Sequence, residues 1–122
     1  MEVDHQSAAK PRQVNMLTLH LWIGFAVAAL AVLAVWQRTG RRITLYVVTV
    51  QIILGIVLVV QGLRGPWYHY GLAAAGWIGY MAANALGRRP GGARTALIVT
   101  VISSLLVLIA FGIGQQAVRG AP

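Results

Sequence analysis

The chain has 122 residues, 58% of them hydrophobic, and a length of this order suits one domain. Ten Lys and Arg residues against two acids give a net charge of +8, but the basic residues flank long apolar segments, so orientation in a membrane explains them better than nucleic-acid binding does. We therefore expect no nucleic-acid partner. Cysteine is absent, which is compatible with any cellular compartment.

Four long apolar segments account for most of the chain. Each is about 21 residues long, which at about 1.5 Å per residue reaches about 31 Å and matches the hydrocarbon core of a lipid bilayer. None of them contains Asp, Glu, Lys or Arg. They lie at residues 16–36, 43–63, 67–87 and 95–115. The sequence therefore predicts an all-α membrane protein with four transmembrane helices.

The connections between these segments are short and rich in Gly, Pro and Arg. They read QRTGRR at 37–42, RGPW at 64–67 and RRPGGAR at 88–94. Glycine and proline end helices, and connections this short predict an antiparallel up-down-up-down four-helix bundle over residues 16–115. Polar tails precede and follow it, at 1–15 and 116–122. The first apolar segment is too long for the apolar part of a signal peptide, so we expect it to be retained.

The basic residues predict how the bundle is oriented in the membrane. One side has six arginines: Arg38, Arg41, Arg42, Arg88, Arg89 and Arg94. The other side has four basic residues: Lys10, Arg12, Arg64 and Arg119. Because positive residues are enriched in cytoplasmic connections, we expect the six-arginine side to face the cytoplasm and both termini to lie outside it.

Two histidines, His20 and His69, lie within the first and third apolar segments. Ionisable residues inside membrane spans are rare and usually functional. Both histidines lie near the start of their segments, and these two segments run in the same direction in the predicted bundle. Their rings are therefore expected at a similar depth, near the outer face. The third histidine, His5, is in the polar tail.

Small residues dominate the helix faces below both histidines. Below His20 the same face presents Gly24, Val27, Ala31 and Ala34. Below His69 it presents Ala73, Gly76, Tyr80 and Ala83. Small residues leave about 10 Å of open slot along the helix axis, which suits a heme with an imidazole on either side of its iron. Two alternatives stay open: each histidine is a hydrogen-bonded polar residue, and the small residues are helix-packing surfaces.

Other metals suit these residues less well. Zinc takes four ligands from Cys, His or carboxylate side chains, and the membrane segments offer only two histidines. Copper would have to recruit Met16 or Met81, and Met81 lies deep in its segment, away from the outer face. Iron in a heme is therefore the metal that the sequence favours.

The residues LHLWIGFAVAALAVLAVW at 19–36 are similar to the histidine-bearing helix of the heme A synthase family. VQIILGIVLVVQGL, which begins at residue 50, and HYGLAAAGWIGYMA, which begins at residue 69, resemble the family's next two helices. Members of that family consist of two four-helix halves, each with a histidine pair that binds heme near the outer face. This chain resembles one half, over about residues 16–115. The resemblance implies that His20 and His69 are the axial ligands of one heme b.

One departure from the family bears on activity. The family's catalytic half carries Glu-x-x-His-Arg around the first ligand, whereas Leu17 and Leu21 stand at the Glu and Arg positions here. Leucine cannot accept a proton. The resemblance is therefore closer to the half that holds heme b as a cofactor, and we expect no conversion of heme O to heme A by this chain alone. Two axial histidines leave the iron no open position, which favours electron transfer or heme handling.

Further residues would complete such a site. Gly24, Gly76 and Tyr80 line the predicted slot. Arg64 lies on the side of both histidines, where it would pair with a heme propionate or anchor the chain at the interface. A row with four-residue spacing would dock another helix of the bundle or of a second copy in a homodimer. This row consists of Gly71, Ala75, Gly79 and Ala83.

We expect an integral protein of a prokaryotic plasma (inner) membrane whose partners are the lipid bilayer and heme. Two other function classes stay open. One is a structural or assembly subunit of a larger respiratory membrane complex. The other is a small four-span transporter, which is the least favoured because proton-coupled exporters of this size need a membrane carboxylate and these segments have none.

Overall fold

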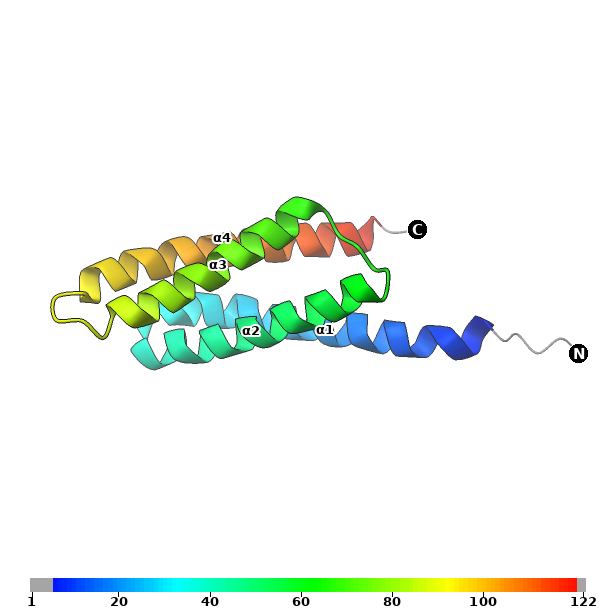
Figure 1. Ribbon diagram of the computed structural model, residues 1–122, viewed down its shortest axis with the longest axis horizontal. Helices are drawn as coiled ribbons and strands as arrows, with labels where there is room; N and C mark the ends of the chain where they lie inside the picture. The colour runs from blue at the N-terminus through cyan, green and yellow to red at the C-terminus, as the bar shows by residue number, and fades with distance from the viewer. Residues whose placement is uncertain (1–5, 121–122) are drawn as a thin grey trace, which may run out of the picture.

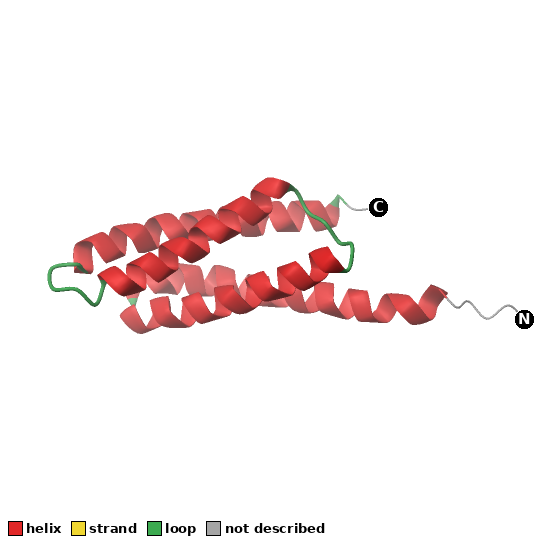
Figure 2. Cartoon of the chain, viewed as in Figure 1, coloured by secondary structure: helices red, strands yellow, loops and turns green. Residues whose placement is uncertain are grey.

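The computed structural model describes residues 6–120, and these residues form four helices joined by short connections (Figures 1 and 2). The helices are α1 (Gln6–Trp36), α2 (Arg38–Val60), α3 (Trp67–Leu86) and α4 (Ala93–Arg119). The expectation of an all-α protein is therefore confirmed. His5 and both acids, Glu2 and Asp4, lie outside the described residues.

Three of these helices are long and apolar enough to cross a membrane: α2, α4 and the Met16–Trp36 part of α1. Helix α3 has 20 residues and no charged side chain. It is not among the helices that meet the same criterion of length and hydropathy. A fourth span at α3 stays a prediction.

The first two helices are separated by one residue, Gln37, which has an extended backbone with φ −129° and ψ 129°. Helix α2 therefore begins at Arg38, within the stretch 37–42 that was expected to be a connection. Thr44 stabilises this tight junction, because its hydroxyl donates to the carbonyl of Gly40 at 2.6 Å and lies 3.1 Å from that of Leu30. The arginines at the start of α2 are thus held on a helix.

The other two connections lie at opposite ends of the molecule in Figure 1. Residues 61–66 join α2 to α3 at the end where α4 finishes, and residues 87–92 join α3 to α4 near Gln37. Each contains a glycine with a positive φ, +93° at Gly62 and +74° at Gly91, a conformation that other L-residues rarely adopt. Pro66 stands immediately before α3, where its missing N–H removes no helical hydrogen bond.

The core lies between all four helices and is built largely from small side chains. Helix α3 packs along α4 and α1 along α2, with further contacts from α1 to α4 and from α2 to α3. The buried apolar cluster consists of Val27, Ala31, Ala34, Val48, Tyr80 and Val107. At its centre the Tyr80 hydroxyl donates to the Ser104 hydroxyl at 2.8 Å, and Ser104 donates to the Ala31 carbonyl at 2.8 Å. One chain of hydrogen bonds therefore joins α3, α4 and α1.

Large apolar side chains cover the outside of the bundle. Exposed Leu, Ile, Val, Trp and Phe residues occur on the outer faces, and the exposed fraction reaches 80% at Trp67 and 73% at Trp36. A soluble monomer rarely exposes apolar surface on this scale, whereas a bilayer solvates it. Trp36 and Trp67 lie at helix ends, where an aromatic belt is expected.

Candidate functional site: the histidine pair

His69 lies in the first turn of α3 and its ring is held by α4. Its Nδ1 is 2.7 Å from the carbonyl oxygen of Ala110, and because a carbonyl only accepts, Nδ1 carries the proton. The second ring nitrogen, Nε2, is then the atom with a free lone pair. Gly114 lies against the same ring, and a Cβ there would be 2.9 Å from the ring carbon Cε1. Helix α4 thus fixes both the position and the tautomer of His69.

His20 lies on α1 and is held by α2. The Gln51 amide nitrogen donates to the backbone carbonyl of His20 at 2.9 Å and is 3.4 Å from its Nε2. Gly55, one turn further along α2, makes room for the ring, because a Cβ there would be 3.4 Å from Cε1. The other ring nitrogen, Nδ1, is buried and has no hydrogen-bond partner among the described residues. His20 therefore brings one uncommitted nitrogen into the interior.

His20 and His69 lie at the same level of the bundle, because Gly24, one turn from His20, faces Phe111 of α4, and His69 contacts Ala110 and Gly114 of the same helix. They come from α1 and α3, which are not consecutive, so the fold brings together two residues that are far apart in the sequence. Each ring is about half-buried. We call this region the histidine end: His20, His69 and the residues that hold them, Gln51, Gly55, Ala110 and Gly114.

The glycine and tyrosine expected below the histidines have defined places. A Cβ on Gly24 would be 3.3 Å from the Gln51 amide nitrogen and 3.4 Å from the Phe111 ring, so this glycine lets both side chains approach α1. A Cβ on Gly76 would be only 2.5 Å from a methyl group of Val107. Tyr80 is fully buried in the core. Gly76 and Tyr80 therefore serve the close packing of α3 on α4, and the open slot expected beneath His69 is filled by α4.

The other small residues of α3 behave in the same way. A Cβ on Gly79 would meet the side chain of Ser103 on α4, so this member of the four-residue row docks a helix of the same bundle. Nothing lies within 4 Å of the Cβ position of Gly71. The end of the row at Gly71 therefore faces no other helix among the described residues. Arg64 is exposed in the connection between α2 and α3, at the end where α3 and its first-turn His69 begin (Figure 1).

The donor set fits a heme better than a metal ion held by protein alone. The described residues contain no group of three or more His, Cys, Asp or Glu side chains close enough to share a metal ion. Zinc and similar ions need such a group. A heme supplies four nitrogens itself and needs only two axial side chains. A hydrogen bond from the other ring nitrogen to a carbonyl, like that of His69 Nδ1 to Ala110, is also what orients metal-binding histidines.

Sequence reasoning left out the part played by α4. Ala110 and Gly114 carry no functional group, so nothing in their chemistry marks them as site residues. The only signal is spacing, since they are four residues apart and share a helix face, as Gln51 and Gly55 do on α2. Gln51 joins α2 to α1 through the hydrogen bond that its amide donates to the His20 carbonyl.

A comparison of the chain with protein-family models, with curated proteins and with solved structures finds no match.

Proposed function

We propose that this protein is an integral membrane heme-b-binding protein in which His20 and His69 are the two axial ligands. The observation that carries the proposal is the state of the two rings. His69 has its Nδ1 bonded to a carbonyl, which leaves Nε2 as a ligand atom. His20 has only a long contact at Nε2, 3.4 Å from the Gln51 amide nitrogen, which leaves the lone pair of Nε2 available to a ligand. The resemblance to the heme-b half of the heme A synthase family points to the same two residues.

The membrane arrangement belongs to the same proposal. Helices α1 to α4 cross the membrane four times, up-down-up-down, with the apolar outer faces in lipid. The histidine end faces outward and the cytoplasmic side carries the arginines at the start of α2 and the end of α3. The protein resides in the inner membrane of a prokaryote. A second copy or a larger respiratory complex is its redox partner or neighbour.

The chain's residues have defined tasks in this proposal. His20 and His69 hold the iron. Ala110 keeps the proton on Nδ1 of His69, so that Nε2 carries the lone pair that would bind the iron. Gln51 anchors the backbone at His20, and Arg64 pairs with a propionate. When bound, the heme would supply one-electron transfer.

The test is the absorption spectrum of the full chain purified in detergent, oxidised and reduced, with and without added hemin. The wild-type chain is expected to give a six-coordinate low-spin b-type spectrum. His20→Ala and His69→Ala should each lose heme or leave a five-coordinate species. His5→Ala is the matched control and should change neither. Equal heme content in all three variants would sink the assignment.

The second candidate is a structural or assembly subunit without heme. The observation that favours it is that both histidine residues form hydrogen bonds with neighbouring helices. Such bonds would give the histidines a purely structural role in helix packing. Under this alternative the protein binds no hemin, and the alanine variants lower the stability of the bundle without any spectroscopic change. The same purified samples therefore decide between the two candidates.

A further inference from the structure

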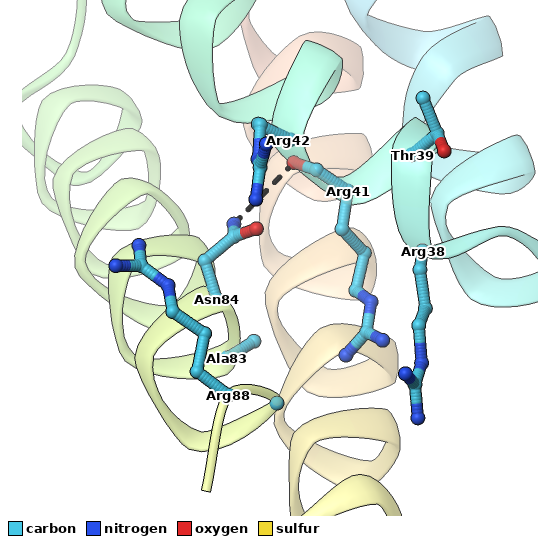
Figure 3. Close-up of a pocket in the computed structure, with 8 residues that line it drawn as sticks. Arg38, Thr39, Arg41, Arg42, Ala83, Asn84 and Arg88 are labelled. Atoms are coloured by element: carbon cyan, nitrogen blue, oxygen red, sulfur yellow. Dashed lines mark hydrogen bonds between the residues drawn. The ribbon is translucent and has the colours of Figure 1, made fainter.

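A basic pocket lies at the end of the molecule opposite the 61–66 connection, between the start of α2 and the end of α3 (Figure 3). Its volume is about 290 Å³. Four arginines line it: Arg38, Arg41, Arg42 and Arg88. These are four of the six arginines that the sequence places on one side of the membrane, and the structure gathers them around one space. We call this region the arginine end.

Arg41 is unlike the other three arginines because it is buried. Only 9% of its surface is exposed, and its Nη1 has no hydrogen-bond partner in the described part of the chain. Figure 3 shows its side chain extending from α2 in the same direction as that of Arg38. A guanidinium group is always charged in a protein. Burying it without a counter-charge costs several kcal/mol.

The chain itself has almost nothing to balance this charge. Its only acidic side chains are Glu2 and Asp4, so residues 6–120 contain no carboxylate side chain. The start of α2 adds to the positive potential, because its first turn has no acidic residue and no side-chain cap. The counter-charge at this pocket must therefore come largely from outside residues 6–120.

Two structural explanations account for part of this arrangement. The positive-inside rule requires arginines at the cytoplasmic ends of helices, but exposed ones such as Arg89 satisfy it without any burial. The carbonyl end of α3 is also partly negative, and Gly87 at that end lies beside Nη1 of Arg41. That partial charge is smaller than one unit, and no carbonyl there accepts a hydrogen bond from Nη1.

We propose that the arginine end binds a phosphate-bearing anion, with Arg41 as its central contact. The planar guanidinium fork pairs with two phosphate oxygens, and an anion in a pocket partly shielded from water binds more strongly than one on an open surface. Asn84 holds the start of α2 on α3 by donating to the carbonyls of Arg41 and Tyr80, which keeps the pocket in shape. The phosphate comes from an anionic phospholipid headgroup or from a free phosphate in solution. This inference rests on the membrane placement proposed above but not on heme.

The test measures the thermal unfolding midpoint of the full chain in a neutral detergent. Three additions are compared: phosphatidylglycerol, phosphatidylcholine and inorganic pyrophosphate. Phosphatidylglycerol is expected to raise the midpoint by about 5 °C and phosphatidylcholine by much less. A rise with pyrophosphate as well would assign the site to free phosphates, whereas a rise with phosphatidylglycerol alone would assign it to a lipid headgroup. No rise with either anion overturns the proposal.

Variants separate the pocket from general surface charge. Arg41→Gln should abolish most of the rise, and Arg89→Gln, which removes an exposed arginine from the same side, should keep it. If both variants lost the rise in midpoint equally, general surface charge would explain the rise and the proposal would be overturned. Arg41→Lys keeps the positive charge but removes the planar guanidinium group, and it replaces the glutamine variant in the test if that variant does not fold. It should retain less phospholipid phosphorus through purification than the wild type, while bound heme is unchanged.

Discussion

The histidine end and the arginine end each bury a side-chain nitrogen that has no partner within the described residues: Nδ1 of His20 and Nη1 of Arg41. The two differ in what the protein can do about it. An imidazole can be neutral, so an unfilled histidine site leaves only an unsatisfied polar group, at about 1–3 kcal/mol. A guanidinium group cannot lose its charge, so an unfilled arginine site leaves a buried cation. Under the two proposals above, the histidine end would be stable without its ligand, whereas the arginine end would need its anion for stability.

The largest expected difference between the two ends is the side of the membrane on which each lies. Labelling from one side should reach one end and not the other. Thr39→Cys and Ala93→Cys mark the arginine end at exposed positions, and Leu63→Cys marks the 61–66 connection. Because the arginines favour the cytoplasm, a membrane-impermeant thiol reagent should label only Leu63→Cys in intact cells. Labelling after permeabilisation shows that all three thiols are accessible. Labelling of Thr39→Cys and Ala93→Cys from outside would reverse the orientation while keeping the two ends apart.

A large effect is expected at the histidine end from Gly114→Val. The first added carbon would be 2.9 Å from the His69 ring, so the ring must leave its hydrogen bond to Ala110. Loss of most of the bound heme, or a change to a five-coordinate spectrum, should follow. Gly112→Val is the matched control, since nothing lies within 4 Å of that position on the same helix. Identical spectra for the two variants would remove α4 from the site.

A smaller effect is expected from Gln51→Leu. This variant removes the hydrogen bond to the His20 carbonyl, and it should lower the free energy of unfolding by about 1 kcal/mol. Gln116→Leu changes an exposed glutamine near the end of α4 and serves as the control. Denaturant titration in mixed micelles measures both. A Gln51→Leu protein as stable as the control would show that the bond to His20 contributes nothing net.

The helices were predictable because their signals are strong and local. Long apolar runs free of charge mark α1, α2 and α4. Helix α2 ends at Val60, before the predicted 63, and helices extend beyond the predicted bounds where polar residues are helical. Arg38 at the start of α2 is such a position, because arginine suits a connection and a helix equally well. Sequence alone does not decide between these two, and the structure places the helix start there because Gln37 alone makes the turn.

The candidate site was predictable only in part. His20 and His69 stand out because a polar ring in an apolar segment is rare. The role of the small residues beneath them depends on the distance between helices. A row of glycines lines an open slot when the neighbouring helix is far away and a packing interface when it is close. Gly76 admits Val107, which the sequence of α3 alone does not reveal. The residues of α4 that contact His69 are apolar or lack a side chain, so their chemistry does not identify them in the sequence.

The hydrogen bond from Ser104 to the Ala31 carbonyl has a consequence for how the protein assembles. It joins residues 73 positions apart, so α1 obtains this partner only after most of the chain has been synthesised. Until then, neighbouring helices are able to pair locally: α1 with α2 through the single-residue turn, and later α3 with α4. Because it joins α1 to α4, the bond from the buried serine fixes the register of the α1–α2 pair against the α3–α4 pair.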